Sequence, residues 1–148
     1  MKNQLPSLFV LLLVLLALHQ FTGPAADHKS QRLYRRNISG DQLIARAFKY
    51  KWENFKVQGE GRVVREWILN DVLPRHQEFI IRLASGQTLH VAHNLDRAPA
   101  LPPLYMGDRI QFSGQYQYTP QGGLIHHTHK NPEGLGGGWI RHKDHIYQ

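Results

Sequence analysis

From Phe55 onward, side chains alternate between two faces at every second position, and this alternation limits the possible folds most strongly. Between Phe55 and Val63, apolar residues and glycines share one face while Lys56, Gln58 and similar polar residues share the other. A period of two is typical of a β-strand that is buried on one side. Glycines inside such a strand permit strong coiling. The pattern therefore predicts a long, coiled strand at the start of a sheet.

The rest of the chain repeats this alternation in shorter segments separated by turns. Two segments on either side of Ser85-Gly86 predict a hairpin, and the proline-rich stretch 98–103 predicts a stiff connection. The remaining strands are expected after Gly107-Asp108, after Gln121-Gly122-Gly123 and at the C-terminal end. The predicted segments are Glu78–Leu83, Thr88–Ala92, Ile110–Tyr118, Leu124–His129, Trp139–Ile140 and Ile146–Tyr147.

One helix is expected before these strands. The run Ser39-Gly40-Asp41-Gln42 matches a capping box, in which Ser39 and Gln42 satisfy free backbone groups reciprocally. Leu43, Ile44 and Ala47 then recur at helical spacing, and we expect the helix to end near Asn54. The chain is thus predicted to be mainly β, a small five- to six-stranded barrel with one N-terminal helix. The strand pattern resembles an oligonucleotide/oligosaccharide-binding (OB) fold.

The N-terminus carries the pattern of an export signal. Lys2, the apolar run Leu8–Leu18 and the small residues Gly23–Ala26 predict a signal peptide over residues 1–26. Its removal would leave about 122 residues, enough for one modest core and without a stable membrane span. An uncleaved anchor is the alternative. We expect a periplasmic or extracellular protein, with a flexible basic arm at 27–38 and an OB-like domain at 39–148.

Charge and composition narrow the function classes. The chain has no cysteine, which excludes disulfides, thiolate metal sites and cysteine nucleophiles, and its net charge is +7. From Asp27 to Arg65 there are ten Lys/Arg against four Asp/Glu, whereas from Glu66 to Gln148 there are seven of each. The positive charge therefore belongs to the N-terminal third. It favours anionic partners, including nucleic acid bound through the arm, or it serves solubility alone.

Histidines gather in the neutral part of the chain and mark the candidate site. Eight of the ten lie between His76 and His145. Imidazole binds metals and exchanges protons near neutral pH, so His93, His126 and His129 could hold a divalent transition metal such as zinc. Arg97 and Trp139 are candidate ligand-binding residues. The candidate catalytic residues are His76, His93, Asn94, His126, His129 and His142.

Several motifs together resemble one family of small exported bacterial proteins, catalogued as domain of unknown function 3465. The resemblance covers about two thirds of the chain. It implies an OB-like exported domain, without an assigned activity, and points to the six candidate residues named above. In that family an aromatic residue replaces His127, so His127 is the less favoured site member. The motifs are Gly61-Arg62-Val63, His76–Ile80, His93–Pro99, Gly107-Asp108, Gly122–His126, Thr128-His129 and Gly138–His142.

Three functions fit these residues. The first is an exported OB-like module that binds a polar or anionic ligand, such as nucleic acid, oligosaccharide or metal, in a cleft lined by His and Asn. The second is a histidine- or metal-dependent hydrolase of the phosphodiesterase or nuclease kind, with histidines as acid and base and Asn94 or Arg97 on the phosphate. The third is a metal-buffering or envelope interaction protein. We favour the binding module.

Overall fold

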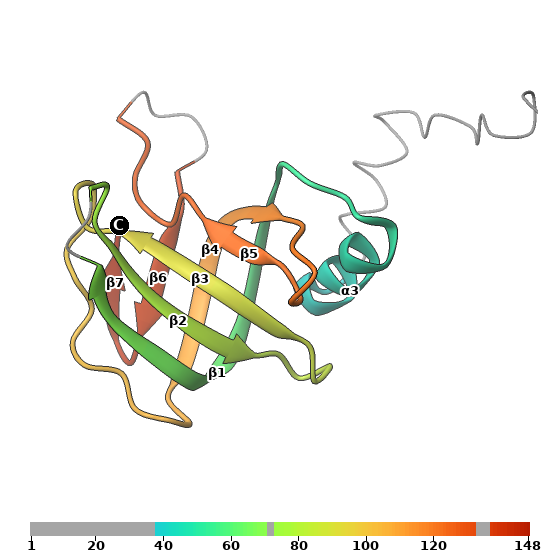
Figure 1. Ribbon diagram of the computed structural model, residues 1–148, viewed down its shortest axis with the longest axis horizontal. Coiled ribbons are helices and arrows are strands. Elements are labelled where there is room, and N and C mark those ends of the chain that lie inside the picture. Colours follow the sequence, from blue (N-terminus) through green and yellow to red (C-terminus); the bar gives the residue numbers. More distant parts are fainter. Residues whose placement is uncertain (1–37, 71–72, 133–136) are drawn as a thin grey trace, which may run out of the picture. The chain divides into compact units, whose positions relative to one another are not determined.

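The computed structural model describes residues 38–70, 73–132 and 137–148, which form a mainly β body with one helix (Figure 1). The expected signal peptide and nearly all of the expected basic arm lie outside the described residues. Among the described residues, no helix has the length and apolar character needed to cross a membrane. The elements are α3 (Gly40–Tyr50), β1 (Phe55–Asn70), β2 (His76–Arg82), β3 (Thr88–Asn94), β4 (Arg109–Gln117), β5 (Leu124–His126), β6 (Trp139–His142) and β7 (His145–Tyr147).

Five strands close into a barrel. Their order is β1-β2-β3-β5-β4, and β4 pairs again with β1. The β3–β5 contact is parallel and the other contacts are antiparallel. Strands β6 and β7 continue from β4 outside this ring. The predicted mainly β barrel with one N-terminal helix is confirmed, while its OB-like character stays a prediction.

The helix begins as the sequence predicts and ends earlier. Ser39 Oγ accepts from the Gln42 amide at 3.3 Å, and Gln42 Oε1 accepts from the Ser39 amide at 3.2 Å, which completes the capping box. Helix α3 stops at Tyr50 because Lys51 adopts a left-handed conformation with φ of 54°. A left-handed residue at this position is a common helix terminator. The prediction of an end near Asn54 was therefore about one turn too long.

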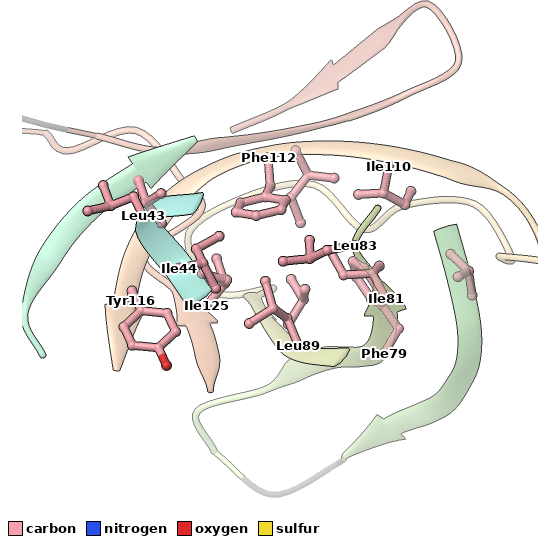
Figure 2. Packing of buried hydrophobic residues seen from close by; sticks show 14 of the residues in the cluster. Leu43, Ile44, Phe79, Ile81, Leu83, Leu89, Ile110, Phe112, Tyr116 and Ile125 are labelled. Atoms are coloured by element: carbon pink, nitrogen blue, oxygen red, sulfur yellow. The ribbon is translucent and has the colours of Figure 1, made fainter. Parts of the chain in front are cut away.

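The core lies inside the barrel and is completed by the helix. Phe112 and Ile125 of the barrel strands are fully buried, as is Ile44 of α3. Figure 2 shows Ile44 reaching in beside Ile125, so the helix contributes to the same apolar cluster as the strands. Burial of side chains this size contributes about 1.5–3 kcal/mol each. The alternating burial of β2 and β3 confirms the predicted hairpin.

Two strands differ most in length from the sequence prediction. Strand β1 runs on to Asn70 and bends at a register shift between Val63 and Arg65, which a strict alternation could not reveal. Strand β5, expected to reach His129, ends at His126. The next residue, His127, has φ of 52°, which is incompatible with extended backbone.

Gly40 supplies a test of how the helix sits on the barrel. A Cβ at Gly40 would lie 1.8 Å from the carbonyl oxygen of Gln58 on β1. In an unconstrained helix, Gly→Ala stabilises by about 1 kcal/mol. We expect Gly40→Ala instead to lower the free energy of unfolding by about 1–3 kcal/mol, because the helix must move off β1. Urea denaturation measures this free energy of unfolding, and Ala45→Gly on the exposed face of α3 is the control. A Gly40→Ala variant that is more stable than the unmodified chain would contradict the packing.

Candidate functional site

A pocket of about 440 Å³ opens where β3 and β5 end and β4 passes beside them. Among the described residues, its lining combines one cation with amides, imidazoles and a glycine, and contains no carboxylate. We call it the histidine pocket. Its residues are Asn94, Arg97, Gln115, His127, His129, Asn131 and Gly137.

The end of β5 directs two histidines into this pocket. The left-handed backbone of His127 turns the chain out of the strand, so both His127 and His129 line the cavity. Their ring centroids lie 5.8 Å apart in an edge-to-face arrangement, and the ring of His126 lies 4.3 Å from that of His127. His127 thus lines the pocket, although the family resemblance makes it the less favoured site member. A non-glycine residue with positive φ is itself a common feature of functional sites.

Both pocket imidazoles are oriented through Nδ1. His127 Nδ1 lies 2.7 Å from Gln115 Oε1, and His129 Nδ1 lies 2.9 Å from the Lys130 carbonyl oxygen. These oxygens only accept, so Nδ1 carries the proton and donates in each ring. In the neutral ring, Nε2 then keeps its lone pair. Each histidine is therefore fixed in the tautomer that can accept a proton or a ligand's hydrogen bond at Nε2.

Arg97 is the permanent charge of the pocket. Partial burial is the largest cause that lowers the pKa of His127, and the nearby His129 and Arg97 lower it further. Burial first, and the nearby guanidinium after it, therefore favour the neutral imidazole of His127. A pocket whose described residues offer a guanidinium and several N–H donors, with no carboxylate among them, is suited to an anion.

A compact turn after β3 presents Asn94 and Arg97. The side-chain oxygen of Asn94 accepts from the Asp96 amide at 2.9 Å, and its carbonyl accepts from the Ala98 amide at 3.1 Å. Asp96 in turn accepts from the amide and Nε of Arg75, at 3.0 and 2.9 Å. These bonds hold the pKa of Asp96 below its usual range. The predicted His93–Pro99 motif is therefore a turn whose internal bonds position Asn94 and Arg97.

His93 lies beneath the pocket and is fully buried. Its Nε2 is 3.0 Å from the Pro99 carbonyl oxygen and its Nδ1 is 2.8 Å from Thr128 Oγ1. The carbonyl requires a proton on Nε2, so Nδ1 accepts from the threonine hydroxyl. Both ring nitrogens are used within the protein, and in this arrangement neither is available to a metal ion. His93 ties the turn after β3 to the segment that carries His129.

His76 and His126 lie close to this group without lining the cavity. His76 is opposite Asn94 in the β2–β3 register. Partial burial, followed by the neighbouring His127 and His76, lowers the pKa of His126. Its Nε2 is buried and has no hydrogen-bond partner among the described residues. These two side chains therefore lie just outside the lining of the pocket.

Two predicted site residues lie elsewhere. His142 on β6 is almost fully buried, and its Nε2 is 3.1 Å from Asp108 Oδ2, in a different group from the pocket residues. Trp139 is opposite Ser113 across the β4–β6 contact, with the Arg141 guanidinium 5.8 Å from its ring. Asp108 also accepts from the Tyr105 amide. The structure therefore does not bring these two into the lining of the histidine pocket.

Sequence reasoning missed Gln115 and Asn131. Gln115 lies on the polar face of β4, and its side chain bridges His127 and Asn54, with Nε2 3.4 Å from Asn54 Oδ1. From the sequence, only its position on the polar face of the strand could be predicted. Within the described ranges, no group of three or more His, Cys, Asp or Glu side chains has a metal-binding arrangement. The metal site at His93, His126 and His129 stays a prediction.

Fold and site together define a small closed β-barrel with a polar, cationic pocket at the ends of its strands. The chain belongs to the family described as Protein of unknown function (DUF3465), whose family model matches residues 30–148. No curated protein and no solved structure matches the chain.

The buried state of His93 is directly measurable. Burial, followed by the neighbouring His129 and His76, lowers its pKa, against the opposing effect of the Pro99 hydrogen bond. We expect ¹⁵N NMR to show a neutral ring protonated at Nε2, which stays neutral when the pH falls below the ordinary histidine value of about 6.5. The unfolded chain would bind a proton at His93 that the folded chain does not bind. Folding stability should therefore decline as the pH falls from about 6.5 toward the folded pKa. Titration of His93 at or above its ordinary value would contradict the assignment.

Proposed function

We propose that this protein is an exported module that binds a polar or anionic ligand, with an anionic group of that ligand held in the histidine pocket. The observation that carries the proposal is the lining, which offers the Arg97 guanidinium and, over the part of the chain that the structure describes, no carboxylate. Arginine binds phosphate and carboxylate groups through paired, charge-assisted hydrogen bonds. Export rests on the N-terminal sequence pattern alone.

The donors around Arg97 support the same ligand chemistry. Asn94 uses its side-chain oxygen within the turn, which leaves its amide N–H groups as donors at the pocket. The Nε2 atoms of His127 and His129 accept hydrogen bonds when neutral and donate when protonated. The pocket would therefore suit a phosphate-type group that also carries hydroxyl donors. Nucleotides and oligonucleotides have this combination, and the basic residues expected at 27–38 would attract them further.

The proposal is tested with pyrophosphate as the probe. In ¹⁵N-resolved NMR of the full chain, we expect the amide signals of Asn94 and Gly137 to shift on titration. Arg97→Gln should raise the Kd by about tenfold or more, since a charge-assisted hydrogen bond contributes about 1.5–3 kcal/mol. Arg46→Gln on the exposed face of α3 removes the same charge and should leave the Kd within about twofold. Equal affinities of the two variants would contradict the proposal.

A histidine-dependent hydrolase is the second candidate, and one observation favours it. His127 and His129 are neighbours whose Nδ1 atoms are both held by acceptors, so one Nε2 could accept a proton while the other donates one. Arg97 would hold the phosphodiester. A water molecule would attack the phosphorus and lose its proton to one imidazole, while the other imidazole protonates the leaving oxygen.

The hydrolase candidate predicts a loss of turnover without a loss of binding. With bis(p-nitrophenyl) phosphate as substrate, His127→Ala and His129→Ala should each lower kcat by about 10²–10⁴-fold, because each removes one partner in proton transfer. The Kd for pyrophosphate should change much less than in Arg97→Gln. Undetectable turnover by the unmodified chain, or unchanged kcat in both variants, would exclude this candidate and leave the binding module standing.

A further inference from the structure

Three arginines form a row across neighbouring strands at some distance from the histidine pocket. Arg62 of β1 lies directly opposite Arg82 of β2 and Arg109 of β4, and all three are exposed. Like charges directly opposite one another destabilise a sheet. Along β4, Arg109 and the pocket residue Gln115 are separated by about 20 Å of extended strand. The barrel therefore keeps an unfavourable concentration of charge well apart from the first site.

The neighbouring groups neutralise only part of this charge. Arg109 donates through Nε and Nη2 to Glu60 Oε2, at 3.2 and 2.6 Å, and these bonds hold the pKa of Glu60 below its usual range. Arg62 Nη1 donates to the carbonyl oxygen of Gly107 at 2.9 Å, which orients the guanidinium but leaves its charge. Among the described residues, no carboxylate forms an ion pair with Arg62 or Arg82. Arg62 and Arg82 thus have no direct ion pair, although the Glu60 carboxylate also acts on Arg62 through space.

The same arginines line a cavity of about 540 Å³. Its floor includes Gly61, where a Cβ would lie 2.8 Å from the Arg82 carbonyl oxygen, so a side chain there would displace the β1–β2 contact. Met106 lies at the rim and is 84% exposed. Glu60 is the one carboxylate in the lining, and it is already engaged by Arg109. The cavity therefore has room for a ligand beside two available guanidinium groups.

We propose that this arginine pocket, formed by Arg62 and Arg82 with Gly61, Met106 and Gly107, is a second anion site that takes a phosphate or sulfate group. Planar guanidinium groups match such oxyanions geometrically. Arg62, fixed by the Gly107 carbonyl, and Arg82 contact the anion, while Arg109 stays with Glu60. The bound charge would also relieve the repulsion between Arg62 and Arg82.

The test follows the amide signals of Gly61 and Gly107 during a pyrophosphate titration of the full chain. These signals are expected to shift. Arg62→Gln and Arg82→Gln should each raise the Kd read from these signals by about tenfold or more. Glutamine keeps a polar side chain but removes the charge. The dispersion of the remaining signals shows whether each variant is folded. Arg46→Gln is the charge-matched control and should bind as the unmodified chain does. Unshifted Gly61 and Gly107 signals, or equal affinity in all variants, would overturn the proposal.

Arg97→Gln separates this site from the histidine pocket. It should raise the Kd read at Asn94 and Gly137 by about tenfold or more and leave the Kd read at Gly61 within about twofold, because sites this far apart act independently. If it raised both Kd values alike, the claim of a separate site would be overturned. A parallel titration with a short oligothymidylate identifies the source of the group. Tighter binding of the oligonucleotide than of pyrophosphate at Gly61 would assign the site to a phosphodiester, and the reverse would assign it to a free oxyanion.

Discussion

The pairing of β1 with β4 is the contact on which the rest of the structure depends. It runs from Phe55 opposite Tyr116 to Arg62 opposite Arg109 and turns an open sheet into a closed barrel. Closure leaves no free edge on either strand and encloses the apolar side chains. The ring of Phe112 fits over Gly59, where a Cβ would lie 2.9 Å from the ring. The alternation of small and large residues across this contact is therefore what lets the barrel close.

The same pairing places both proposed binding sites. At one end of the contact, Gln115 reaches the histidine pocket, and Lys56 opposite it donates to the Gly137 carbonyl oxygen. At the other end, Arg62 and Arg109 meet at the arginine pocket. Each site takes its remaining residues from a turn or strand end, where the backbone can leave extended geometry. A rigid barrel with functional groups at its strand ends is a common arrangement in ligand-binding proteins.

The sequence predicted the elements better than their neighbours in space. The capping box at Ser39 and the alternation of β2, β3 and β4 are local patterns, and each element formed where expected. His90 lies opposite Leu124 in the parallel contact of β3 with β5. This contact joins segments far apart in the chain, and no local pattern predicts it. The early end of β5 depends on the left-handed backbone of His127. A histidine at this position does not by itself specify that conformation.

The candidate site shows the same division. Arg97, Asn94 and His129 line one pocket, and the sequence had already singled them out. Buried His93 could not be distinguished from a ligand-binding histidine, because its two partners, Thr128 and the Pro99 carbonyl, come from different loops. His142 belongs with Asp108, a pairing set by the β4–β6 register. Motif spacing identifies residue types, whereas the closed barrel determines which of them meet.

An anion bound beside Arg97 in the histidine pocket would be seen most directly in a crystal structure of the protein grown with excess pyrophosphate. We expect electron density for the anion within hydrogen-bond distance of the Arg97 guanidinium and the side-chain amide of Asn94. An empty histidine pocket at a saturating concentration of pyrophosphate would contradict this expectation.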